Sequence, residues 1–101
     1  MCIAILKPKN KTIKKEHLEN SFYSNDDGAG FMFNHDNKLH IYKGFMDFES
    51  FWNSFSSMNT KDKTCLIHFR IKTHGAISKE NCHPFLVSDK LGFIHNGIIK
   101  I

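Results

Sequence analysis

The segment FMFNHDNKLHIYK, residues 31–43, indicates an antiparallel sheet. Two largely apolar runs, FMFN and LHIYK, flank the polar residues His35, Asp36 and Asn37. Asp and Asn in a short polar break between two such runs are typical of a hairpin turn. We therefore expect two adjacent strands here that run in opposite directions.

A helix is expected on each side of this hairpin. Before it, Thr12 is a candidate N-cap for a helix over residues 14–24, which the stretch NDDGAG ends. After it, Asp47 is a second candidate cap. The large apolar residues that follow it at helical spacing are Phe48, Phe51, Trp52, Phe55 and Met58. Such a stripe is more typical of a core-facing helix than of a cofactor site.

Apolar runs outside the helices predict the remaining strands. Residues 2–6 form one run, and TCLIHFR, PFLVS and LGFIH, beginning at residues 64, 84 and 91, form three more. A chain of 101 residues has room for one small domain. The order of the elements therefore predicts one α+β domain over residues 1–101 with mostly antiparallel sheets.

Composition restricts the class of protein. Hydrophobic residues are 41% of the sequence and aromatic residues 13%, as in a domain with a packed core. The net charge of +4 comes largely from lysines between residues 7 and 15, which we expect in a solvated loop. No stripe of arginine and aromatic residues continues that cluster, so we expect no nucleic-acid partner.

The same composition predicts a cytoplasmic protein that does not associate with membranes. No apolar run is long enough to cross a bilayer, and charge appears at Lys7 before a signal peptide could form. The three cysteines, at positions 2, 65 and 82, are an odd number without the spacing of a disulfide framework. Reduced thiols in a reducing compartment fit this pattern.

Three parts of the sequence carry candidate chemistry, each with a structural alternative. Cys2 heads an apolar run, where a cysteine is usually a small core residue. Arg70 ends a predicted strand, where its planar fork suits a carboxylate ligand or a surface ion pair. Asn96 and Gly97 end another run, and this pair forms either a hairpin turn or two donors that could hold an oxyanion.

A metal site is a further alternative, and we expect none. The available ligands are Cys65, His68, His74, Cys82, His83 and His95. They include no CxxC or HxxxH spacing, and Cys82 and His83 would point in different directions in an extended chain.

Five blocks, MCIAI, DDGAGF, HFRIKTHG, NCHPF and HNGII, give the chain a resemblance to a known family. In order and approximate spacing they resemble those of the class II glutamine amidotransferases, in particular the glutaminase domains of glucosamine-6-phosphate synthase and amidophosphoribosyltransferase. Compact phage and bacterial versions look most similar. The resemblance implies an N-terminal-nucleophile (Ntn) hydrolase fold, an αββα sandwich. Because the family's domains extend well past the HNG block, we expect this chain to hold the first half of the sandwich.

The resemblance also implies a reaction, hydrolysis of the side-chain amide of L-glutamine to glutamate and ammonia without a cofactor. Removal of Met1 would expose Cys2, whose thiolate attacks the amide while its own α-amine acts as the base. Asn96 and the Gly97 N–H would form the oxyanion hole. Ammonia would pass to an acceptor synthase domain or subunit, as it usually does in the family.

Substrate binding is implied at a second group of residues. Arg70 would bind the α-carboxylate of glutamine, and Thr73 and His74 would shape the loop that holds the substrate. The sequence departs from the family pattern at Ile71, where the large synthases often have an aromatic residue, and at Ser24-Asn25, where an Arg-Gly pair is frequent. The alternative function is a non-catalytic glutamine-binding or interaction module of the same fold.

Overall fold

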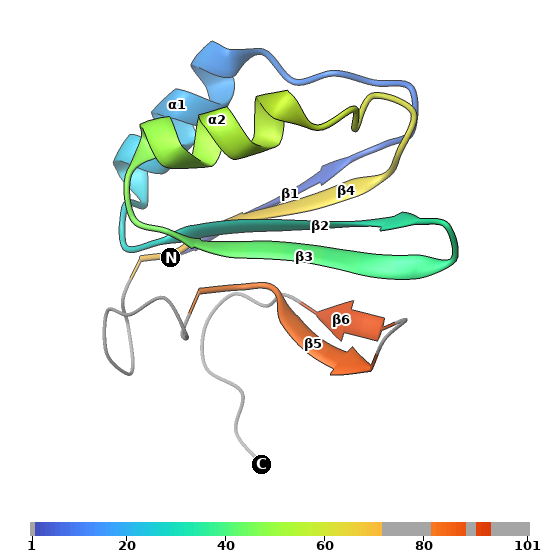
Figure 1. Ribbon diagram of the computed structural model, residues 1–101. Helices are drawn as coiled ribbons and strands as arrows, with labels where there is room; N and C mark the ends of the chain where they lie inside the picture. Colours follow the sequence, from blue (N-terminus) through green and yellow to red (C-terminus); the bar gives the residue numbers. More distant parts are fainter. Residues whose placement is uncertain (1, 72–81, 89–90, 94–101) are drawn as a thin grey trace.

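A computed structural model of the chain describes residues 2–71, 82–88 and 91–93 (Figure 1). The elements are β1 (Ile3–Lys7), α1 (Lys15–Ser24), β2 (Ala29–His35), β3 (Lys38–Phe45), α2 (Phe48–Ser57), β4 (Cys65–Phe69), β5 (Phe85–Ser88) and β6 (Leu91–Phe93). The α+β class and the antiparallel strand pairing expected from the sequence are therefore observed. The αββα sandwich of an Ntn hydrolase stays a prediction.

The described strands form two antiparallel sheets. The larger has the order β1-β4-β2-β3, and β5 pairs with β6 in the smaller one. Figure 1 shows both helices over one face of the larger sheet and the β5–β6 hairpin on the other side. Within the described part of the chain, no helix has the length and apolar character that spanning a bilayer requires. This arrangement leaves one sheet face for the core and the opposite face for the candidate site.

The central hairpin forms as the sequence predicts, with a tighter turn. Asp36 and Asn37 have φ values of 52° and 61° and make a two-residue connection, whereas His35 belongs to β2. Two consecutive residues with positive φ match the twist of the strands in such a connection, and Asp and Asn tolerate this conformation. The three-residue turn expected from the sequence is therefore one residue too long.

The two helix starts differ in how well the sequence predicts them. The Asp47 carboxylate accepts a hydrogen bond from the Ser50 N–H at 2.8 Å, which confirms it as the N-cap of α2. The prediction for Thr12 is wrong, because α1 begins after Lys14, whose side chain makes no capping hydrogen bond. The chain at Lys14 is still extended, with φ −64° and ψ 139°, so Thr12 lies too far before the first helical turn to cap it.

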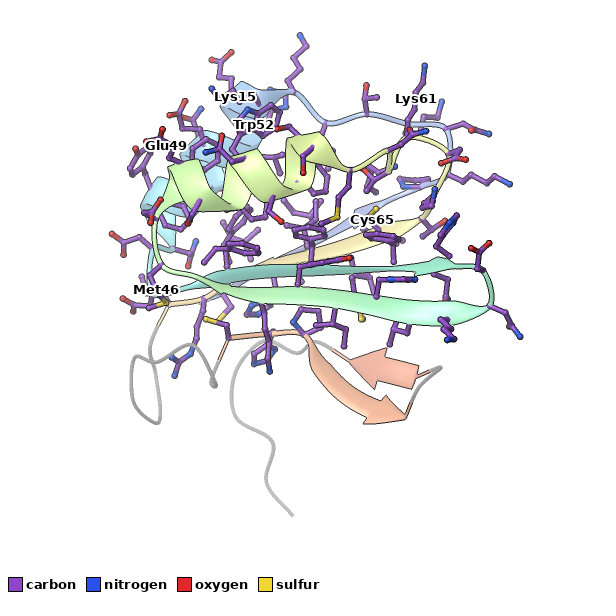
Figure 2. All side chains as sticks on the ribbon, in the orientation of Figure 1. Lys15, Met46, Glu49, Trp52, Lys61 and Cys65 are labelled. Atoms are coloured by element: carbon purple, nitrogen blue, oxygen red, sulfur yellow. The ribbon has the colours of Figure 1, made fainter. Side chains whose placement is uncertain are left out.

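The hydrophobic core lies between the helices and the larger sheet, and Figure 2 shows the side chains that fill this space. Alternate residues of β2 and β4 point into it, while α1 and α2 contribute one apolar face each. Its buried members are Leu18, Phe22, Ala29, Phe31, Phe33, Phe48, Phe51, Phe55, Cys65, Ile67 and Phe69. Phe51 is fully buried, with the Phe31 and Phe69 rings edge-on to it at 5.9 and 5.2 Å. The aromatic stripe of α2 is thus a core feature, as predicted.

Lys7 does not belong to the solvated lysine cluster in which the sequence places it. Its side chain is only 3% exposed, and its ammonium group donates to the carbonyl oxygens of Lys63 at 2.7 Å and Lys11 at 3.1 Å. The carbonyls of Pro8 and Lys61 lie within 3.4 Å. Main-chain acceptors of two loops thereby satisfy the buried cation.

Candidate functional site

The candidate site lies on the face of the larger sheet opposite the helices. Strand register places Ala4, His68, Gly30 and Lys43 in one row across β1, β4, β2 and β3. Every second residue of a strand lies on the same face, so Arg70, two residues after His68, lies in the next row toward the end of the sheet. The pairing continues there, since the Arg70 N–H donates to the Gly28 carbonyl at 2.8 Å.

Cys2 lies at this end of the sheet. The β1–β4 register pairs Ile3 with Phe69, and its extension by one residue places Cys2 opposite Arg70. The Cys2 thiol donates to the Ile71 carbonyl with an S–O distance of 3.6 Å. Cys2 is partly exposed and lies outside the helix-facing core. The structure therefore does not place Cys2 in the helix-facing core, and its role as a nucleophile stays a prediction.

Arg70 is buried, whereas one of the two alternatives from the sequence was a surface ion pair. Its side chain is 6% exposed, and it is the only arginine of the sequence. Its main chain is fixed on both sides, because the Asp27 N–H donates to the Arg70 carbonyl at 2.8 Å in addition to the bond with Gly28. A guanidinium on such a rigid strand end is suited to bind a carboxylate in a defined orientation.

A bulge in β3 supplies a residue that the sequence did not suggest. The β2–β3 register shifts between Ala29 and Gly30, and Gly44 has a positive φ of 84°. The extra residue reverses the alternation of side chains beyond it. Phe45 therefore stacks on Phe31 in the core, and Met46 reaches the opposite face beside Gly28.

Residues 82–84 cover Gly30 of β2 and Gly28, which lies just before this strand. The Cys82 sulfur is 4.0 Å from the Met46 sulfur, and the His83 ring stacks on His68 with centroids 4.1 Å apart. All three residues 82–84 are buried, as is His68. Gly28 and Gly30 of the DDGAGF block thus form the surface on which residues 82–84 lie. The local sequence predicted only the end of a helix at this block.

No metal centre is found among the residues that the structure describes, since no three His, Cys, Asp or Glu side chains converge there. Two of the candidate ligands lie on opposite faces of β4, because Cys65 points into the core and His68 points away from it. Burial raises the pKa of the Cys65 thiol, which therefore stays protonated at neutral pH.

Four of the predicted site residues lie outside the described part of the chain. They are Thr73, His74, Asn96 and Gly97, and the candidate metal ligand His95 lies outside it as well. Their roles stay predictions. Of the predicted set, the structure describes Cys2 and Arg70, and it brings both to the same end of the sheet.

A hollow of about 510 Å³ lies at a different place on the surface. Its lining includes Leu6, Met32 and Leu66, which share a row two residues beyond that of Ala4 and His68. Neither Cys2 nor Arg70 contributes to it. The hollow is therefore separate from the thiol and the guanidinium that could do chemistry.

A partly exposed cysteine and a buried arginine at the same end of a sheet suit an enzyme that acts on a carboxylate-bearing substrate, and comparisons with known proteins point to one class. The chain is 42% identical over 53 residues to the probable glutamine amidotransferase DUG3 of Saccharomyces cerevisiae, a match covering 48% of this chain and 15% of that protein. It is 46% identical over 35 residues to glutamine–fructose-6-phosphate aminotransferase (isomerizing) of Pseudomonas aeruginosa, covering 35% of this chain and 6% of that protein.

These two similarities support a relationship to glutamine amidotransferases. They span less than one sixth of the length of each of the two proteins. No family model and no solved structure matches the chain.

Proposed function

We propose that this chain carries the glutaminase site of a class II glutamine amidotransferase, with Cys2 as an N-terminal nucleophile and the described sheets as part of an αββα sandwich. One observation carries the proposal: Cys2 directly precedes β1 and Arg70 directly follows β4, at positions that continue the antiparallel pairing of these two strands at one end of the sheet. Neighbouring positions on one face bring a nucleophile and a carboxylate-binding group within the length of a small amino acid.

Arg70 would hold the α-carboxylate of L-glutamine through two parallel hydrogen bonds. With that end of the substrate fixed, the side-chain amide could reach the Cys2 thiol. Partial exposure of Cys2 is required for this encounter, and burial of Arg70 strengthens its attraction for a carboxylate because water is excluded.

The reaction would then proceed by acyl transfer. After removal of Met1, the free α-amine of Cys2 takes the thiol proton, and the thiolate attacks the amide carbon. The tetrahedral oxyanion, held by Asn96 and the Gly97 N–H, collapses with transfer of a proton to the leaving nitrogen, and ammonia departs. Water, deprotonated by the α-amine, hydrolyses the γ-glutamyl thioester and releases glutamate. Ammonia would be used by an acceptor site on another domain or subunit.

The direct test is covalent labelling with a diazo-ketone analogue of glutamine, which alkylates an activated thiol. Intact mass should show loss of Met1 from the expressed protein and one added label, with peptide mapping to Cys2. Cys2→Ala should abolish both labelling and the release of ammonia from glutamine. Cys65→Ala is the matched control, because the Cys65 thiol is buried in the core. This variant should be labelled at Cys2 to the same extent as the unsubstituted protein.

Retention of Met1 would contradict the mechanism, because the α-amine would then be in a peptide bond. Labelling at Cys65 or Cys82 in place of Cys2 would also overturn it. Saturable glutamine binding with intact Met1 and no ammonia release would favour the non-catalytic module.

A further inference from the structure

Residues 82–84 lie directly against Gly28 and Gly30 on the larger sheet. A Cβ atom added to Gly30 would overlap the His83 carbonyl oxygen, and one added to Gly28 would overlap the Cys82 sulfur. Gly28 also has a φ of 131°, a conformation that other residues rarely adopt. The absence of side chains at both positions therefore permits this close approach.

A pair of histidines holds residues 82–84 against β4, next to Gly28 and Gly30. The rings of His68 and His83 are nearly parallel, with an interplanar angle of 11° and a centroid distance of 4.1 Å. They are 0% and 7% exposed. Stacked, buried rings resist both sliding and lifting of the segment because either motion would expose their apolar faces to water.

The part of the sheet face that residues 82–84 cover ends beside Cys2, the proposed nucleophile. On this face, Gly28, Gly30 and His68 are buried, whereas Ala4 is exposed and Cys2 partly exposed on the adjoining β1. The boundary between covered and open surface thus runs between β4 and β1. A substrate bound at Cys2 and Arg70 would meet the edge of the covering segment there.

We propose that residues 82–84 form one wall of the glutamine pocket and that His83, stacked on His68, is the positioning residue that holds this wall. The inference rests on the proposed function and adds a residue pair that sets the affinity for substrate without taking part in the chemistry. The wall limits the space above the sheet on the side of β2, so that glutamine is held over β1 and against Arg70. Displacement of the wall should loosen the substrate and leave the thiol reactive.

The test measures saturation of Cys2 labelling by the diazo-ketone analogue, and of ammonia release by L-glutamine, in the full protein. His83→Ala removes the stacked ring and should raise both half-saturating concentrations about fivefold, the order of effect of one aromatic stack. The maximal labelling rate should change by less than about twofold, because a positioning residue acts on binding and not on the nucleophile. His83→Phe keeps a flat ring and should restore the native half-saturating concentrations.

His40→Ala is the matched control. This histidine also stacks on an aromatic ring of the sheet, Phe33, at a centroid distance of 5.4 Å, but on the core face and at the other end. The His40→Ala substitution should leave both half-saturating concentrations unchanged. Reversible unfolding raises a half-saturating concentration only by the reciprocal of the folded fraction. Reduced stability could therefore imitate a rise of about fivefold only if about four fifths of the variant were unfolded, and circular dichroism of the same sample excludes or detects that.

If His83→Ala has the same half-saturating concentrations as the unsubstituted protein, the proposal that residues 82–84 form a wall is wrong, and the proposed function stays intact. The wall is likewise overturned if His83→Phe shifts them as much as His83→Ala, because the stacked ring would then not be the cause. Should His83→Ala fail to fold, the comparison of His68→Phe with His68→Asn decides in the same way. Absence of any Cys2 labelling in the unsubstituted protein would overturn both proposals.

Discussion

The Cys2 thiol donates to the main-chain carbonyl of Ile71 at 3.6 Å, a contact between residues 69 positions apart. It joins the beginning of β1 to the residue after Arg70, so the thiol and the guanidinium are positioned by the same strand pairing. The candidate site therefore exists only when β1 and β4 are paired. Any change that unpairs these strands should remove thiol reactivity and carboxylate binding together.

Replacement of Arg70 by lysine tests carboxylate binding. A single ammonium cannot reproduce the two parallel hydrogen bonds of a guanidinium, so Arg70→Lys should raise the half-saturating glutamine concentration about ten- to hundredfold. Steady-state kinetics measure this, with Lys43→Arg as a control for altered cation geometry elsewhere on the same sheet face. An unchanged half-saturating concentration would remove Arg70 from the site.

Asn96 separates catalysis from binding. If its amide donates only to the developing oxyanion, Asn96→Ala should lower turnover by roughly two to three orders of magnitude and leave glutamine affinity nearly unchanged. A residue that merely forms a turn would instead alter stability modestly and turnover very little. Turnover and half-saturation measured on the same preparation, with the unfolding midpoint as a reference, distinguish the two roles.

The buried ammonium of Lys7 should be important for stability. Lys7→Met keeps the length of the side chain but removes the donor from main-chain carbonyls of two loops, which should lower the free energy of unfolding by about 2 kcal/mol. Lys9→Met is the matched control, because Lys9 is exposed, and its effect should stay within about 0.5 kcal/mol. Chemical denaturation measures both, and equal effects would contradict the role assigned to Lys7.

Cys65 should contribute to instability at alkaline pH. Burial raises the pKa of its thiol in the folded state, so the unfolded chain loses this proton first as the pH increases. The stabilisation is complete below the ordinary thiol pKa and is lost as the pH rises through the raised value, with a slope of at most about 1.4 kcal/mol per pH unit. Unfolding curves between pH 7 and 10 should show a shallower decline for Cys65→Ala. Identical slopes would contradict this assignment.

The local sequence was sufficient to predict most elements of the fold. Two apolar runs around a polar break predicted the hairpin at Asp36, and the helical spacing of Phe51 and its neighbours predicted a core-facing helix. Both signals depend on residues close together in the chain. The Asp47 cap was predictable for the same reason, since its hydrogen bond closes over three residues. Thr12 had the chemistry of a cap as well, but the connection from β1 stays extended past it and the helix begins later.

Only the tertiary structure decided how distant residues meet. Cys2, Arg70 and Gly28 come together because β4 lies between β1 and β2, and no local pattern specifies that order. The burial of Lys7 depends on carbonyls of a loop more than fifty residues away, at Lys61 and Lys63. The sequence by itself thus determined the elements and the types of side chain available for chemistry. Strand order, the Gly44 bulge and the packing of residues 82–84 determined which of them share one surface, because these depend on long-range contacts.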